Sequence, residues 1–163
     1  MSVRTADLCD QFGEEVQVLE PLFQDYGGVA SFWGRIATVD VFEDNLLVRE
    51  MLDRPGEGQV LVVDGGGSLQ AALLGEELAR LAQDNGWAGI VIYGSVRDVA
   101  GLAEIGIGIR ALASTPRASF KRGNGACDLP LHFAGVGFRP PAYLYADEDG
   151  ILVAPRDLLA EAE

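Results

Sequence analysis

The apolar residues of this chain form short continuous runs that alternate with glycine-rich turns and with segments of helical spacing. The runs Gln59–Asp64 and Gly89–Tyr93 are typical of strands that are buried on both faces. Between them, Leu73–Asp84 repeats leucine at helical spacing, and Gly86 follows as a helix-ending residue. A strand, a glycine loop and a helix in repeated succession indicate an α/β fold.

The flanking segments predict further elements of both kinds. Thr5 is expected to cap a helix that ends at Gly13. The β-branched and aromatic residues of Ala30–Phe42 predict a strand, and Ile107–Ala113 predicts another. The other predicted elements are helices at Glu43–Leu52 and Val99–Glu104, short strands at Leu129–Phe133, Val136–Phe138, Tyr143–Ala146 and Ile151–Ala154, and a terminal helix or frayed tail at Arg156–Glu163. We therefore expect residues 1–163 to form a single compact α/β domain with a mixed sheet and a strand-rich C-terminal third.

The composition narrows the possible partners. The 163 residues include 25 Asp and Glu against 12 Lys and Arg, which gives a formal net charge of −13. Nucleic-acid affinity rests on Lys and Arg that displace counterions, so direct binding to DNA or RNA is not expected. The charge suits either a basic protein partner or solubility alone. With two cysteines, no apolar run long enough for a membrane helix and no signal-peptide pattern at the start, we expect a soluble cytoplasmic protein.

Scarce residue types limit the possible chemistry. Lys121 is the only lysine and His132 the only histidine, and no Gly-x-Ser-x-Gly segment is present. His132 alternates with apolar residues in a predicted strand, which favours a structural role. Lys121 stands in a polar run, a poor setting for the desolvated amine of Schiff-base chemistry. Any catalysis is therefore expected to use carboxylates, arginine, backbone amides or an oxygen-ligated metal.

Two short segments are candidates for a binding site. Gly75-Glu76-Glu77-Leu78 stands near the start of a predicted helix, where free amides can bind a carboxylate. The alternative is that Glu76 and Glu77 only complement the helix dipole. Arg97 and Asp98 follow a predicted strand, where arginine can hold a carboxylate and aspartate can bind a hard divalent cation. The alternative there is a surface ion pair or a helix cap.

Two other segments are weaker candidates. Asp64-Gly65-Gly66-Gly67-Ser68 lacks the third glycine of a dinucleotide fingerprint and the lysine of a P-loop, so we expect a tight turn beside a site. Asp147-Glu148-Asp149-Gly150 lacks the spacing of a calcium-binding EF-hand, and its last two residues are expected to form the turn between two strands.

Several segments together resemble one known family in the same order along the chain. They are Glu20-Pro21-Leu22-Phe23, Gly28-Val29-Ala30-Ser31-Phe32, Val62–Ser68, Ile92-Tyr93-Gly94-Ser95-Val96-Arg97 and Leu144-Tyr145-Ala146-Asp147. The family is that of the regulator of ribonuclease E activity A, which also includes class II 4-hydroxy-4-methyl-2-oxoglutarate aldolases. The resemblance implies a swivelling-type β/β/α fold that assembles as a homotrimer, with sites near subunit boundaries.

The aldolase branch of that family implies roles for the two candidate segments. The resemblance implies that the amides of Gly75, Glu76, Glu77 and Leu78 bind a substrate carboxylate, that Arg97 contacts the substrate, and that Asp98 holds a divalent metal, Mg or Mn. The implied reaction is retro-aldol cleavage of a 2-oxo acid to two pyruvates. Oxaloacetate decarboxylation accompanies it, because both reactions pass through the pyruvate enolate.

One residue departs from the aldolase pattern. Where Arg-Asp-x-x-Glu/Asp is expected, Gly101 replaces the second carboxylate, and Glu104 lies one helical turn further on. The regulator branch binds ribonuclease E and dampens RNA decay, and its typical members lack the metal aspartate. Because Gly75, Arg97 and Asp98 are all retained, the sequence favours a metal-dependent aldolase and decarboxylase, with a non-enzymatic ribonuclease E regulator as the alternative.

Overall fold

The structure, a computed structural model, describes residues 3–162, so Met1, Ser2 and Glu163 of the predicted domain lie outside it. The elements are α1 (Thr5–Phe12), the 3-10 helix η1 (Gly13–Glu15), β1 (Gln17–Val18), β2 (Gln24–Asp25), β3 (Phe32–Asp40), α2 (Leu46–Leu52), β4 (Val60–Asp64), β5 (Ala72–Leu74), α3 (Glu76–Asp84), β6 (Gly89–Val96), α4 (Val99–Leu102), β7 (Gly108–Ser114), β8 (Ala126–Cys127), β9 (Leu131–Phe133), β10 (Val136–Phe138), β11 (Tyr143–Asp147), β12 (Gly150–Ala154) and α5 (Leu159–Ala162). No helix within that part of the chain is long and apolar enough to cross a membrane.

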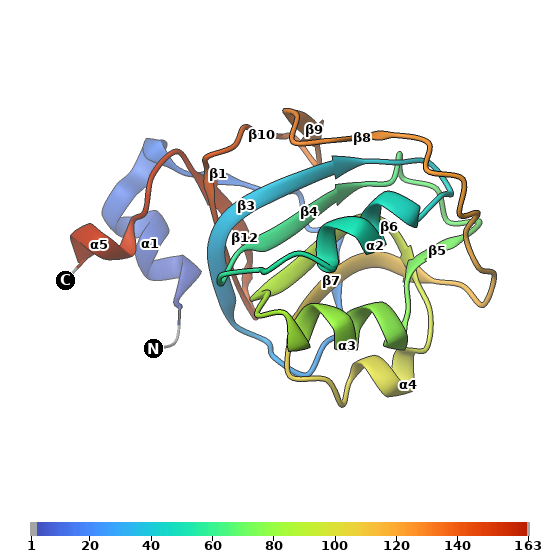
Figure 1. The fold of residues 1–163 in the computed structure, drawn as a ribbon. Coiled ribbons are helices and arrows are strands. Elements are labelled where there is room, and N and C mark those ends of the chain that lie inside the picture. The colour runs from blue at the N-terminus through green and yellow to red at the C-terminus, as the bar shows by residue number, and fades with distance from the viewer. Residues whose placement is uncertain (1–2, 163) are drawn as a thin grey trace.

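A mixed sheet runs through the molecule in the strand order β1-β12-β11-β3-β4-β6-β7-β2 (Figure 1). The central strands β3, β4, β6 and β7 are parallel to one another, and β5 pairs parallel with β6 beyond the end of β4. The outer strands β1, β12, β11 and β2 are antiparallel to theirs. The α/β fold with a mixed sheet and a strand-rich C-terminal third is confirmed.

Alternate side chains of the central strands enter two separate cores. Leu61 and Val63 of β4 pack in the core beneath α2 and α3, which Figure 1 shows in front of the sheet. Val60 and Val62 pack on the opposite face against the β9–β10 hairpin. Burial on both faces is the reason that this strand reads as a continuous apolar run.

The helix α1 lies beside α5 at the far end of the sheet (Figure 1) and is fastened to β11 by a buried carboxylate. Asp147 accepts hydrogen bonds from the backbone N–H of Thr5 at 2.8 Å and from its hydroxyl at 2.6 Å. Burial alone would raise the pKa of Asp147, but these bonds and those from the amides of Asp149 and Gly150 lower it. Thr5 therefore fixes α1 through its contact with Asp147 and does not cap the helix, whose N-cap is Arg4.

Two predicted helices begin later than the sequence indicates. Leu73 and Leu74 belong to β5, and the helix that follows starts at Glu76. The segment predicted as a helix from Glu43 begins at Leu46, because Glu43 has a positive φ of 54° that no right-handed helix contains. Both differences place a non-helical chain segment near the C-terminal ends of the central strands, where the candidate site lies.

Candidate active site

The end of β6 carries two of the predicted site residues. Arg97 follows Val96 directly, and its backbone N–H donates to the carbonyl oxygen of Leu74 at 2.9 Å. Asp98 comes next in the left-handed region, with φ of 61°, and α4 starts after it. Aspartate is one of the few residues that tolerate this conformation. The turn points both side chains toward the start of α3.

The start of α3 touches this turn through a glycine. The Glu76 amide donates to Asp98 Oδ2 at 2.9 Å, and a Cβ atom on Gly75 would lie 2.6 Å from the same oxygen. Only a residue without a side chain lets the two segments approach this closely. The amides of Glu77 and Leu78 also belong to the first helical turn, which has no intrahelical partners for them. Asp98 thus takes the Glu76 amide, and two amides remain for a ligand.

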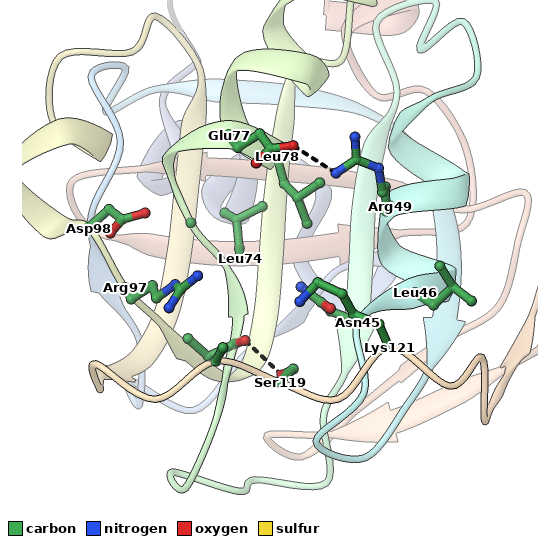
Figure 2. A pocket seen from close by; sticks show the side chains of 13 residues that line it. Asn45, Leu46, Arg49, Leu74, Glu77, Leu78, Arg97, Asp98, Ser119 and Lys121 are labelled. Carbon is green, nitrogen blue, oxygen red and sulfur yellow. Dashed lines mark hydrogen bonds and ion pairs between the residues drawn. The ribbon is translucent and has the colours of Figure 1, made fainter.

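A cavity of about 150 Å³ lies between these segments and α2. Gly75, Glu77, Leu78, Arg97 and Asp98 line it as predicted, whereas Glu76 does not. Figure 2 shows Arg97 and Asp98 on one side, Leu46 and Arg49 on the other, and Leu74 and Leu78 between them. Sequence reasoning missed the lining residues Asn45, Arg49, Ser119 and Lys121, which come from distant segments.

Three cationic side chains border the cavity in an otherwise acidic protein. Arg49 pairs with Glu77 at 2.9 Å, and both side chains are exposed. Neither Arg97 nor Lys121 has an ion-pair partner among residues 3–160. Two unpaired cations on different segments, together with the open amides of α3, suit a small ligand with more than one negative group.

The side chain of Glu76 points away from the cavity, toward Arg80 and Gly101. Its carboxylate pairs with Arg80 at 3.0 Å and lies against Gly101, so that a Cβ atom at position 101 would overlap Glu76 Oε1. The Cβ position of residue 101 is therefore occupied by a carboxylate from α3. Glu104, which lies one helical turn beyond Gly101, does not line the cavity.

The donor set fits only one class of metal ion. No group of three or more His, Cys, Asp or Glu side chains in the described part of the chain could hold a metal. This excludes a closed zinc-type site among those residues. Asp98 offers a single carboxylate at an open cavity, which fits a hard cation such as Mg²⁺ that keeps several waters and takes its other ligands from substrate.

The weaker candidates lie elsewhere. The Gly65–Gly67 turn packs near Phe42 and Tyr93 and does not line the cavity. His132 is exposed in β9, opposite Gly137 of β10. The turn between β11 and β12 consists of Glu148 and Asp149, so Asp149 lies in it as predicted, whereas Gly150 is already the first residue of β12 and pairs with Asp147.

A larger cavity of about 620 Å³ lies near β1 and the β11–β12 turn and is lined by the weaker candidate Asp147–Gly150, but by none of Gly75–Leu78, Arg97 and Asp98. The one cation among its lining residues, Arg110, is buried and already has partners. It forms an ion pair with Asp25 at 3.1 Å and donates a hydrogen bond to the carbonyl of Ala30 at 2.5 Å. Burial lowers the pKa of Arg110, and the neighbouring carboxylates oppose that effect. The smaller cavity is therefore the candidate active site.

Comparisons with known proteins agree with the fold. A family model described as RraA-like, Aldolase/RraA, matches residues 5–153. A protein of Alkalilimnicola ehrlichii named "Putative 4-hydroxy-4-methyl-2-oxoglutarate aldolase" is 55% identical over 159 residues, which cover 98% of this chain and 99% of that protein. A protein of Ectopseudomonas mendocina with the same name is 56% identical over 94% of this chain and 95% of its own length.

Two solved structures are similar over nearly the whole chain. The RNA-processing inhibitor RraA from Thermus thermophilis is 52% identical with a TM-score of 0.92, over 96% of this chain and 94% of that one. A Geobacillus kaustophilus structure described as an S-adenosylmethionine: 2-dimethylmenaquinone methyltransferase is 54% identical with a TM-score of 0.95, over 97% and 98%. The names of these relatives describe different functions, so the choice among those functions for this chain depends on the chemistry of the cavity.

The close approach at Gly75 gives a first testable prediction. In Gly75→Ala the new methyl group displaces the Asp98 carboxylate and breaks its bond to the Glu76 amide, while the fold survives because the contact is the end of a flexible side chain. We expect a crystal structure of the variant to show Asp98 moved and the sheet unchanged. Gly137→Ala is the control, since nothing lies within 4 Å of its Cβ position. An unmoved Asp98 would contradict the prediction.

Proposed function

This chain belongs to the RraA-like Aldolase/RraA family, and we propose that it is a divalent-metal-dependent aldolase that cleaves 4-hydroxy-4-methyl-2-oxoglutarate into two pyruvates. Oxaloacetate decarboxylation is proposed as a second activity through the same pyruvate enolate. The observation that supports the proposal most is one cavity that joins Arg97, Asp98, Lys121 and the first turn of α3.

The cavity offers separate places for the two ends of such a substrate. The amides of Glu77 and Leu78 and the guanidinium of Arg97 can hold the carboxylate and oxo group at one end. Lys121 and Asn45 come from other segments and can bind the distal carboxylate. As the carbon–carbon bond breaks, negative charge develops on the oxo oxygen, and Arg97 can stabilise it with preformed hydrogen-bond donors.

Asp98 is the residue that would hold the proposed Mg²⁺ or Mn²⁺. When bound, such an ion supplies Lewis-acid polarisation of the 2-oxo group. The Glu76 amide donates a hydrogen bond to Oδ2 of Asp98 at 2.9 Å. This bond orients the carboxylate, and because the donor is a neutral amide, the negative charge of Asp98 is retained for a metal ion. This arrangement supports a role for Asp98 in metal binding.

The surroundings of Lys121 disfavour a Schiff base as the alternative electron sink. Lys121 is exposed, whereas a reactive amine of this kind needs a desolvated setting. Its proposed role is therefore that of a point charge for a carboxylate. The methyltransferase named for one relative also fits poorly, because about 150 Å³ is below the ~300–1,000 Å³ of pockets for drug-sized ligands.

The surface beside the cavity supports assembly with further copies. Phe42 is 63% exposed, Phe120 is 55% exposed and Leu69 is 49% exposed, and Phe120 is next in sequence to Ser119 and Lys121 of the cavity. Exposed aromatic side chains of this kind are typical of contact surfaces. We propose a cytoplasmic homotrimer in which these residues face a neighbouring subunit.

The activity and its metal dependence are tested together. We expect pyruvate release from 4-hydroxy-4-methyl-2-oxoglutarate and from oxaloacetate only when Mg²⁺ or Mn²⁺ is added. Asp98→Asn keeps the left-handed turn but removes the charge, so it should abolish both activities and the Mn²⁺ binding measured by calorimetry. Asp128→Asn is the matched control, because Asp128 also has a positive φ of 60° and lies outside the cavity. Full activity of Asp98→Asn would remove this carboxylate from the mechanism.

Arg97 gives a prediction on the chemical step. Arg97→Lys keeps the charge but loses the planar fork, and the loss of a preorganised donor costs ~2.7–4 kcal/mol of barrier, or ~10²–10³ in kcat. Steady-state pyruvate release measures the effect. Arg139→Lys, at an exposed position outside the cavity, should leave kcat unchanged. If Arg97→Lys retained near-normal turnover, a generic positive charge would suffice.

A ribonuclease E regulator is the second candidate, favoured by the net charge of −13 and by the similarity to the Thermus inhibitor. If the chain binds a basic segment of ribonuclease E, affinity should fall steeply as salt shortens the Debye length from ~10 Å at 0.1 M to ~3 Å at 1 M. Asp98→Asn should leave that binding intact. Tight, salt-sensitive binding together with no metal-dependent pyruvate release would favour the regulator, and the reverse pattern would favour the aldolase.

A further inference from the structure

A buried carboxylate beside the cavity is bonded entirely to backbone amides. Asp44 is 2% exposed. Its Oδ1 accepts from the Leu46 amide at 3.1 Å and the Gly123 amide at 3.2 Å. Its Oδ2 accepts from the amides of Arg122 at 2.9 Å and Asn124 at 3.4 Å. No cation in the described part of the chain pairs with it.

Three of these bonds join segments that are 78 to 80 residues apart along the chain. The Phe120 amide donates to the Glu43 carbonyl and the Asn45 amide to the Phe120 carbonyl, both at 2.9 Å. Lys121 therefore follows Phe120, whose backbone pairs with the segment around Asp44. It precedes residues 122–124, whose three amides donate to the Asp44 carboxylate. The next residue after Asp44, Asn45, also donates from its side chain to the Leu73 carbonyl at 3.3 Å. One carboxylate thus lies at the junction of both segments that bring polar side chains to this side of the cavity.

We infer that Asp44 is a positioning residue for substrate binding, whose carboxylate holds Lys121 and Asn45 in place for the distal carboxylate of the substrate. This inference rests on the proposed aldolase function, and it identifies the residue that positions the groups for one end of the substrate. An ionised carboxylate is a stronger acceptor for several amides than any neutral side chain of its size. An asparagine in its place would turn an NH₂ group toward amide donors.

The ionisation of Asp44 agrees with this role. Burial alone would raise the pKa of Asp44, but the amides of Leu46, Gly123, Arg122 and Asn124 outweigh it and lower the pKa. The carboxylate therefore remains an acceptor at neutral pH.

The chain contains a matched control for a purely structural effect. Asp147 is also a buried carboxylate held by backbone amides, and its pKa is also lowered, but it fastens α1 and does not line the cavity. A variant of Asp147 should lose stability without a selective change in substrate binding.

The experiment compares Asp44→Asn, Lys121→Met, the double variant and Asp147→Asn in the metal-loaded, full-length protein. Two binding readouts are measured: KM for 4-hydroxy-4-methyl-2-oxoglutarate, and the inhibition constant of pyruvate, which lacks the distal carboxylate. We expect Asp44→Asn and Lys121→Met each to raise KM by about tenfold, as for the loss of one charge-assisted contact. Pyruvate inhibition and kcat should change by less than about threefold, and the double variant should be no worse than either single one.

Three results would overturn the inference: additive effects in the double variant, an equal rise in KM for Asp147→Asn, or a parallel loss of pyruvate affinity. Thermal unfolding shows whether each variant is folded. If Asp44→Asn does not fold, Asp44→Ser, which retains one small acceptor, takes its place with the same expected pattern.

A second measurement separates this inference from the proposed function. Lys121-Arg122 is the only pair of adjacent basic residues in the sequence, so trypsin cleavage there reports on the freedom of the segment. Cleavage should be about tenfold faster in Asp44→Asn than in the wild type or in Asp147→Asn. An inactive wild type with this cleavage pattern would refute the aldolase but leave the anchoring by Asp44 standing, whereas unchanged cleavage would refute the anchoring itself.

Discussion

The segments that follow β5 and β6 meet at a distance that excludes a side chain from one of them. Asp98 Oδ2 would lie 2.6 Å from a Cβ atom on Gly75, and it accepts the Glu76 amide at 2.9 Å. Because β5 and β6 are parallel neighbours, their ends are at the same edge of the sheet. Together with the hydrogen bond from the Arg97 amide to the Leu74 carbonyl, this contact holds the amides of α3 and the guanidinium of Arg97 at one cavity.

Positively charged side chains gather at the cavity, although the chain as a whole carries a negative net charge. A net charge of −13 would repel a small dianionic acid at long range, yet Arg49, Arg97 and Lys121 border one cavity of about 150 Å³. At ionic strengths near 0.1 M, charges more than ~10 Å away are largely screened, so the local cations decide binding. An acidic surface and an anion-binding site are therefore compatible in one protein.

Much of the fold could be predicted from apolar periodicity, because β4 and β6 are buried on both faces and β10 lies where its three residues indicate. The strand β5 could not, since Leu74 and Leu78 keep helical spacing across the turn at Gly75. In the site, Arg97 and Asp98 followed from their place after a strand. Lys121 was considered only as a Schiff-base residue and was set aside because of its polar run. Its place beside Asn45 could not be predicted, because it depends on a pairing of segments that no local pattern encodes.

The departure at Gly101 shows how a motif can mislead when it is read along one segment only. In sequence, the position lacks the carboxylate that the family pattern places there. In the structure, Glu76 reaches this space from α3 and is held by Arg80 at 3.0 Å, so the negative charge near α4 is supplied from another element. Gly101→Asp would consequently add a second carboxylate where one already lies, and the two would repel each other. Gly101 and Glu76 are thus best understood as a pair, in which the absent side chain makes room for the one that is present.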